Sequence, residues 1–276
     1  MKRTETFYDP LGFLSPYVIR SKLPIPKAWL GARDWDELLP SHHQREWTKW
    51  FRELEDLELV KIPRCLKDPS PKVEELSVHT SSDASENPYA AVVYAHHVYE
   101  GESITAQLIM SKSRLASLKA VSIPRLELLG ALIGLRFTRQ VCSAMKTPTN
   151  GVTYLVDIMN VGYWIQGQSR EYYKSRSWPI VGQSREYKPF IAHRVGEIHE
   201  FSAPNQCRYV PCYFGTRGLT VKELLQTDLR WNGLEFLKRS KNKTGQSASL
   251  TSQLQHRTFN LQEQKKQEQR RLPLTK

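Results

Sequence analysis

Residues 122–135 read Ser-Ile-Pro-Arg-Leu-Glu-Leu-Leu-Gly-Ala-Leu-Ile-Gly-Leu and predict the start of a long helix. Ser122 belongs to the residue types that favour the N-cap of a helix, and Pro124 falls in the first turn, where a missing N–H costs no hydrogen bond. Apolar residues then recur at helical spacing, which predicts a face that packs on a core. The residues of this face are Leu126, Leu129, Ile133, Phe137 and Val141.

Glu127 is the only charged residue in the range 126–135. On a helix it shares a face with Gly130, Ala131 and Gly134, whose small side chains leave space beside it. A carboxylate in such apolar surroundings costs free energy unless a partner compensates its charge. Two interpretations stay open at this point: an acid that interacts favourably with the helix dipole, or an acid placed for chemistry.

The composition is that of a chain able to fold around a core. The chain has 276 residues, which allows one large or two small domains, and 39% of them are hydrophobic. No apolar run approaches the length of a membrane span, and the N-terminal residues do not resemble a signal peptide. We therefore expect an intracellular protein, cytoplasmic or nuclear and not secreted, with no membrane among its partners.

The four cysteines do not form a zinc pattern. Cys207 and Cys212 are separated by four residues, but no second pair of Cys or His stands at the spacing of a zinc site. Together with Cys65 and Cys142 they are scattered along the chain, so we expect reduced thiols.

The positive charge is concentrated at the C-terminal end. The formal net charge is +12, which favours a polyanionic partner. Residues 238–276 contain ten Lys and Arg against Glu263 and Glu268, so this segment contributes +8 and the rest of the chain only about +4. The segment is rich in Gln, Lys, Arg and Ser, a composition that predicts a disordered basic tail able to bind phosphates weakly.

Residues 1–70 predict a small, mainly helical connection segment. Its prolines keep the early helices short, and residues 46–60 have the pattern of an amphipathic helix. Tryptophans are frequent here, and core packing is a commoner role for such a set than base stacking. They are Trp29, Trp35, Trp47 and Trp50.

Residues 71–237 predict an α/β domain. The order is three strands, the long helix, a fourth strand, helices, a short last strand and a final helical turn. This order predicts a mixed sheet with an antiparallel start and a parallel continuation. The expected strands are 76–83, 89–98, 103–111, 151–159 and 207–211, and the expected later helices are 190–201 and 220–225.

A short repeat interrupts this domain. Residues 167–172, Gly-Gln-Ser-Arg-Glu-Tyr, recur as residues 182–187. Removing residues 167–181 leaves a continuous sequence, so the repeat indicates a 15-residue tandem insertion, which we expect at a surface connection.

Three isolated acids stand at element ends. Asp83 ends the first strand of the domain, Glu127 starts the long helix and Asp157 ends the fourth strand. Side chains at the carboxyl ends of strands in an α/β sheet meet in one crevice. Three carboxylates there repel one another unless a divalent cation lies between them, and paired Mg²⁺ ions serve phosphodiester hydrolysis. The element order therefore favours a metal-dependent nuclease site.

The chain also resembles a known family, the pol polyprotein of BEL/Pao-type LTR retrotransposons, in the region after the reverse transcriptase. The resemblance covers roughly residues 7–237 and rests on several motifs that match in order. They are Asp9-Pro10-Leu11-Gly12, Trp35-Asp36, Ile62-Pro63-Arg64-Cys65, Ser82-Asp83-Ala84-Ser85, Lys112-Ser113-Arg114, Ile123-Pro124-Arg125-Leu126-Glu127-Leu128, His193-Arg194-Val195-x-Glu197-Ile198 and Arg217-Gly218-Leu219.

The resemblance implies a ribonuclease H-like five-stranded mixed sheet with flanking helices, and cleavage of the RNA strand of an RNA–DNA hybrid with Mg²⁺ or Mn²⁺. Asp83 then matches the first catalytic carboxylate, which bridges two metals, and Glu127 and Asp157 match the second and third, which hold one metal. The implied partners are an RNA–DNA hybrid or other nucleic acid, and the reverse transcriptase part of a polyprotein.

Two departures from the family pattern bear on activity. Asp157 lies between Val156 and Ile158, where the family usually has Thr-Asp-Ser. After Pro211 the family usually has a loop with Asn-Pro-Ala-Asp, whereas here residues 212–216 lead directly to Arg217. The fourth carboxylate is therefore missing, which predicts weak binding of one ion and impaired cleavage.

Three functional hypotheses follow. The first is a retrotransposon-derived ribonuclease H-like nuclease with an incomplete catalytic set. The second is a remnant of that domain that binds nucleic acid or protein without catalysis. The third, an aspartic peptidase, reflects a peptidase name also given to this family, but the sequence contains no Asp-Thr-Gly or Asp-Ser-Gly triplet.

Overall fold

The computed structural model describes residues 7–30, 37–38, 40–67, 71–167, 187–210, 216 and 218–238. The chain divides after Leu237, and residues 1–237 form one compact unit. The predicted basic tail after Lys238 and nearly all of the predicted insertion lie outside the described residues. The division of the first unit into a connection segment and an α/β domain at residue 70 stays a prediction.

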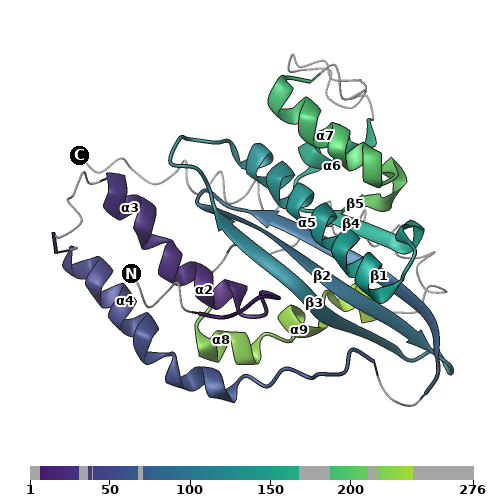
Figure 1. The fold of residues 1–276 in the computed structure, drawn as a ribbon, viewed down its shortest axis with the longest axis horizontal. Coiled ribbons are helices and arrows are strands. Elements are labelled where there is room, and N and C mark those ends of the chain that lie inside the picture. Colours follow the sequence, from purple (N-terminus) through teal and green to yellow (C-terminus); the bar gives the residue numbers. More distant parts are fainter. Residues whose placement is uncertain are drawn as a thin grey trace, which may run out of the picture. The chain divides into compact units, whose positions relative to one another are not determined.

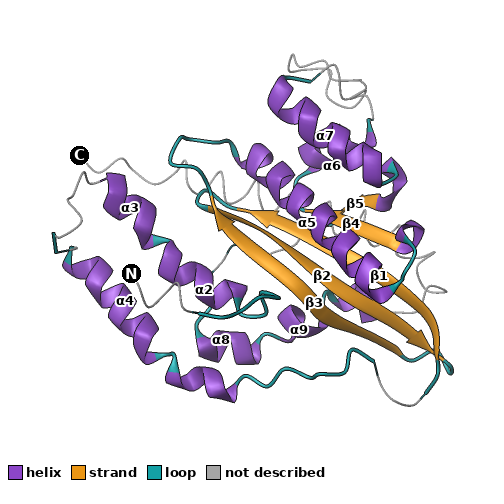
Figure 2. Ribbon diagram, in the orientation of Figure 1, coloured by secondary structure: helices purple, strands orange, loops and turns teal. Residues whose placement is uncertain are grey.

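The centre of the first unit is a five-stranded sheet with the strand order β3-β2-β1-β4-β5 (Figures 1 and 2). β1 pairs antiparallel with β2, and β2 pairs antiparallel with β3. β4 lies parallel to β1 on its other side, and β5 lies parallel to β4. The strands are β1 (Val73–Ala84), β2 (Pro88–Tyr99), β3 (Ile104–Leu115), β4 (Val152–Val156) and β5 (Cys207–Tyr209).

This topology confirms the predicted fold class, a mixed five-stranded sheet with flanking helices. The short connections between β1, β2 and β3 force antiparallel pairing, whereas the helix between β3 and β4 lets β4 return parallel to β1. β1 therefore has a neighbour on both sides, which places its carboxyl end at the middle of one sheet edge.

Helix α5 (Ile123–Met145) is the long helix that the opening stretch predicts, and it packs on β1 and β2. Leu126, Ile133 and Val141 of the predicted core face are buried, while Leu129 and Phe137 are partly exposed. Ser122 is at the N-cap, but its side chain makes no capping hydrogen bond.

The prediction of a single core face on α5 was incomplete. A second set of buried apolar residues packs against α6 (Met159–Gln166) and α7 (Pro189–Phe201). The helix is thus covered on two sides, by the sheet and by the two following helices. Its residues on this second face are Leu128, Leu132 and Leu135.

Gly134 brings α5 close to the sheet, and we expect Gly134→Ala to destabilise the protein. A Cβ at Gly134 would lie 2.7 Å from Cγ2 of Thr80 on β1, so the helix or strand must shift. In the matched control Gly162→Ala on α6, the new Cβ would meet Val156 at 3.7 Å, an ordinary contact. The free energy of unfolding, measured in urea, should therefore be lower in the first variant than in the second by about 1–3 kcal/mol. Equal values would contradict this packing.

The other face of the sheet is also covered. Val93 of β2 packs with residues of α5, whereas its neighbours Val92 and Tyr94 point to the opposite face and pack with Trp231 and Phe13. Neighbouring residues of a strand point to opposite faces of the sheet, so Val92 and Tyr94 lie on the face opposite to α5. Helices from both ends of the described chain pack on this second face. They include α2 (Ser15–Lys22), α8 (Val221–Gln226) and α9 (Asp228–Asn232), followed by a 3-10 turn at Glu235–Lys238.

The N-terminal segment is helical as predicted, with different bounds. The helices are α3 (Pro24–Leu30) and α4 (Ser41–Arg52), followed by a 3-10 turn (Glu55–Leu59). The prediction of one helix over 46–60 was therefore wrong, because the helix begins after Pro40 and ends at Arg52. Trp50 stacks on Tyr17 with ring centroids 4.9 Å apart, which confirms its packing role.

Short 3-10 turns flank the last two strands, at Thr149–Gly151 and Pro204–Gln206. At the start of α8, Thr220 accepts a hydrogen bond from the Glu223 N–H, so its predicted capping role is confirmed. Among the described residues, no helix combines the length and the apolar character that crossing a membrane requires.

Candidate metal centre

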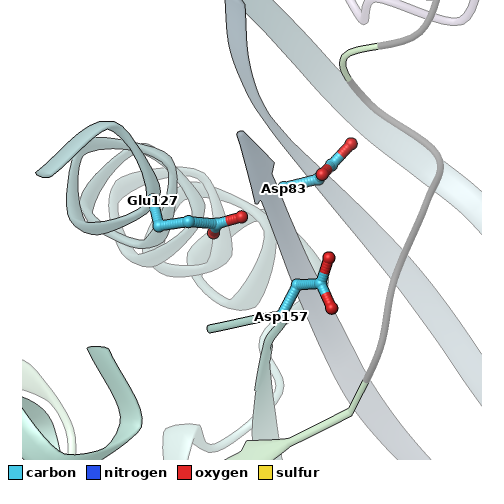
Figure 3. A group of neighbouring side chains, drawn as sticks. All are labelled: Asp83, Glu127 and Asp157. Carbon is cyan, nitrogen blue, oxygen red and sulfur yellow. The ribbon is translucent and has the colours of Figure 1, made fainter. Parts of the chain in front are cut away.

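The three predicted acids meet at one edge of the sheet. Asp83 is the penultimate residue of β1, Asp157 follows the last residue of β4, and Glu127 lies in the second turn of α5. Because β1 and β4 are parallel neighbours, their carboxyl ends lie side by side. Figure 3 shows Glu127 reaching from α5 towards the two aspartates. Each residue offers one carboxylate oxygen, and these three oxygens lie within 4.8 Å of one another.

Glu127 is fully buried and only half satisfied. Its Oε1 accepts a 2.7 Å hydrogen bond from the Ala84 N–H, whereas Oε2 is buried and has no hydrogen-bond partner among the described residues. Burial raises the pKa of Glu127 to about 8; nearby Asp83 and Asp157 add to this rise, and the Ala84 bond opposes it. The apolar surroundings predicted from the sequence are therefore observed, and no positive charge among the described residues compensates the buried acid.

Asp83 is held by a residue that the sequence did not single out. It is 6% exposed, and its Oδ2 accepts hydrogen bonds from the Thr216 N–H at 3.1 Å and from the Thr216 hydroxyl at 2.7 Å. Thr216 is itself buried. It lies 133 residues after Asp83, so no local sequence pattern signals this contact.

The donor set fits a hard divalent cation. Three carboxylates supply oxygen ligands, which Mg²⁺ and Mn²⁺ prefer, and none of the nitrogen or sulfur ligands that zinc favours. A cation also removes the repulsion between the acids and gives the unpartnered Oε2 of Glu127 a partner. The cluster is therefore able to bind a divalent metal through Asp83, Glu127 and Asp157. Which ion binds, and the catalytic roles of the three residues, stay predictions.

Metal affinity should depend on pH between about 6 and 8. A bound cation requires ionised Glu127, whose pKa is about 8 without metal. Below pH 8 each bound ion must therefore release one proton from Glu127, and the affinity should fall by about tenfold per pH unit as the pH is lowered. Calorimetric titration with Mn²⁺ in buffers of different ionisation enthalpy measures both the affinity and the number of protons released. An affinity that stays constant from pH 6 to pH 9 would contradict the raised pKa.

Two basic side chains pack on Phe190 at the start of α7. The guanidinium carbons of Arg125 and Arg194 lie 5.3 Å and 3.6 Å from the ring centroid of Phe190. Arg136 instead forms a bidentate ion pair with Glu197. Along α5, Arg125 contacts Phe190, Arg136 contacts Glu197 and Arg139 contacts Phe201. The contacts on α7 follow the same order as those on α5, so the two helices run parallel. The start of α7 therefore lies next to the start of α5, near Glu127.

A family model described as "Pao retrotransposon-like RNaseH-like domain" matches residues 1–158, more than half of the chain. The match includes Asp83, Glu127 and Asp157. A search of curated proteins finds no match.

Several solved structures are similar at low identity. RNase H1 from the archaeon Halobacterium salinarum is 11% identical, with a TM-score of 0.29, over 55% of this chain and 97% of that one. The N-terminal RNase H domain of a Mycobacterium tuberculosis protein is also 11% identical, with a TM-score of 0.28, over 55% of this chain and 92% of that one. A foamy viral protease-reverse transcriptase in complex with dsDNA is 11% identical, with a TM-score of 0.33, over 77% of this chain but only 40% of that one.

Proposed function

Because the chain belongs to the Pao retrotransposon-like RNaseH-like domain family, we propose that it binds RNA–DNA hybrids and hydrolyses the RNA strand with Mg²⁺ or Mn²⁺, at an impaired rate. The observation that carries the proposal is the convergence of three carboxylate oxygens within 4.8 Å at the carboxyl edge of the sheet. Phosphodiester hydrolysis is the chemistry that such an oxygen-ligand site serves.

In the proposed site the three acids hold the metal ion together, and neighbouring groups orient them. Asp83, Glu127 and Asp157 hold the ion, which when bound activates water and stabilises negative charge on the phosphate. The N–H of Ala84 orients Glu127, and Thr216 orients Asp83. Burial of Glu127 and Asp83 excludes water from one side of the site, which strengthens their interaction with a cation.

The impairment follows from the ligand count. A two-ion site distributes its ligands over both ions, and the family pattern supplies four acids for this purpose. Residues 212–216 contain no acid, and the described residues supply three acids to the cluster. The second ion should therefore bind weakly and the rate of hydrolysis should be low.

A cleavage assay with an end-labelled RNA strand in an RNA–DNA hybrid tests the proposal. We expect slow cleavage that needs Mg²⁺ or Mn²⁺ and is lost in Asp83→Asn, with double-stranded RNA as the control substrate. Rates equal to those of a relative with all four acids would contradict the impairment. Cleavage that Asp83→Asn leaves unchanged would contradict the site.

A binding function without catalysis is the second candidate. The observation that favours it is the contact of Thr216 with Asp83, since a neutral residue there adds no acid to the site. Hybrid binding with no metal-dependent cleavage would support this alternative. The peptidase hypothesis has no support from the sequence, which lacks the Asp-Thr-Gly and Asp-Ser-Gly triplets.

The proposed partners are a nucleic acid and the reverse transcriptase part of a polyprotein. We also propose an intracellular location, in the cytoplasm or the nucleus, since the N-terminal residues do not resemble a signal peptide.

Arg125 and Arg194 are expected to contact phosphates of the bound strand. In the part of the chain that the structure describes, neither forms an ion pair with an acid, and both contact the ring of Phe190 at the start of α7. Replacing both by Gln should reduce the slope of log K against log salt by about two, one for each lost phosphate contact.

Fluorescence anisotropy with a labelled hybrid in EDTA measures this slope. The matched control is Arg45→Gln with Arg64→Gln, which removes the same charge from exposed positions on α4 and after the 3-10 turn. An equal change of slope in both double variants would show that only the overall charge matters.

A further inference from the structure

The contact between Thr216 and Asp83 has a consequence for metal stoichiometry. A carboxylate oxygen has two lone pairs, and both lone pairs of Asp83 Oδ2 face donors, the N–H and the hydroxyl of Thr216. A cation that binds Asp83 in this arrangement must therefore use the other oxygen, Oδ1. A carboxylate that bridges two ions generally offers one oxygen to each, which this arrangement prevents.

We propose that Thr216 stands at the position of a further metal ligand, orients Asp83, and limits the carboxylate cluster to one divalent cation. This inference deepens the proposed function and rests on the proposed metal site. Thr216 is a positioning residue, because it acts on the ion through Asp83.

The distances support the ligand position. Two ligands at neighbouring corners of an Mg²⁺ octahedron, each about 2.1 Å from the ion, lie about 3 Å apart. Thr216 Oγ1 lies 2.7 Å from Asp83 Oδ2, an ordinary hydrogen-bond length that is also close to this separation, so an oxygen ligand at position 216 fits beside Oδ2. Both residues are about 6% exposed, so water has little access to the contact between them.

The charge at this position decides what binds there. A hydroxyl is neutral and donates its hydrogen to Asp83, whereas a carboxylate has no hydrogen to donate and repels Asp83. Thr216→Asp would therefore place a fourth acid against the cluster, and a second cation between positions 83 and 216 would remove the repulsion.

The number of Mn²⁺ ions that the full chain binds tests the proposal. Electron paramagnetic resonance detects free Mn²⁺, so a titration of the protein gives the number of bound ions by difference. We expect one ion in the wild type and two in Thr216→Asp. The matched control, Thr48→Asp on exposed α4, adds the same charge elsewhere and should bind one ion. Thermal unfolding gives a second readout: without metal, Thr216→Asp should melt below the wild type, and Mn²⁺ should raise its melting temperature by more than that of the wild type.

Two milder variants test the positioning role. Thr216→Val removes the hydroxyl bond to Asp83 and should weaken binding of the single ion by about tenfold, in the range typical of lost ligand-orienting contacts. Thr216→Ser keeps the hydroxyl and should retain wild-type affinity. A merely structural role would lower the melting temperature in Thr216→Val without changing the Mn²⁺ affinity, and this result would overturn the positioning role.

The outcomes separate the inference from the proposed function. Two ions in the wild type, or one ion in Thr216→Asp, would overturn the inference and leave the metal site intact. Absence of Mn²⁺ binding in the wild type would overturn both. Two ions in Thr216→Asp without hybrid cleavage would support the inference and contradict the proposed nuclease function.

Discussion

Asp83→Asn is expected to abolish tight Mn²⁺ binding. The substitution keeps the shape of the side chain and leaves an oxygen that can accept the Thr216 hydrogen bonds, but it removes one of the three negative charges of the cluster. Loss of a contact that merely orients a ligand costs 10–100-fold in affinity, so loss of a direct ligand should cost more than about 100-fold. Calorimetric titration with Mn²⁺ measures the change.

The same substitution should affect the metal-free protein in the opposite direction. Asp83 is one of the groups that raise the pKa of Glu127, so removing its charge should lower that pKa and relieve repulsion between the acids. We therefore expect Asp83→Asn to melt at or above the temperature of the metal-free wild type. The charge-matched control is Glu58→Gln, at an exposed position of the 3-10 turn. It should change neither the Mn²⁺ affinity nor the melting temperature. Unchanged Mn²⁺ affinity in Asp83→Asn would contradict the site.

Arg230→Ala is expected to lower the free energy of unfolding by about 3–5 kcal/mol. Arg230 is 1% exposed, and its Nη2 donates to the carbonyl oxygens of Gly12 and Phe13 at 2.9 Å and 3.1 Å and to the Ser111 hydroxyl at 2.5 Å. It thus joins α9 to the turn before α2 and to β3. Truncation removes these three hydrogen bonds and opens a cavity, and each effect is costly.

Urea unfolding of Arg230→Ala, compared with Arg208→Ala, measures this contribution. Arg208 is exposed on β5, so its removal should change the free energy by less than about 0.5 kcal/mol. A loss below about 1 kcal/mol for Arg230→Ala would show that the two ends of the described chain are not joined through this side chain.

The order of elements and the position of the acids could be predicted from the sequence. Alternating and apolar runs identified the strands, and the helical spacing from Leu126 identified α5. Asp83 and Asp157 follow from this order, because parallel strands end at the same edge of a sheet. The family resemblance added the ribonuclease H-like fold, and the strand pairing agrees with it.

The remaining features depend on tertiary contacts that leave no local pattern. The start of α4 at Ser41 was missed because residues 41–46 are polar and mostly exposed, so they carry no helical apolar spacing. A buried arginine such as Arg230 contradicts the usual exposure of this residue type. Thr216 was missed because its contact with Asp83 joins residues 133 positions apart.

The central claim is that Asp83, Glu127 and Asp157 form one divalent-cation site, and a crystal structure of the protein grown with Mn²⁺ tests it most directly. The account predicts one anomalous difference peak at the manganese edge, within bonding distance of one oxygen from each of the three carboxylates. Crystals that contain Mn²⁺ but show no peak at these carboxylates, or a peak bound to only one of them, would contradict the account.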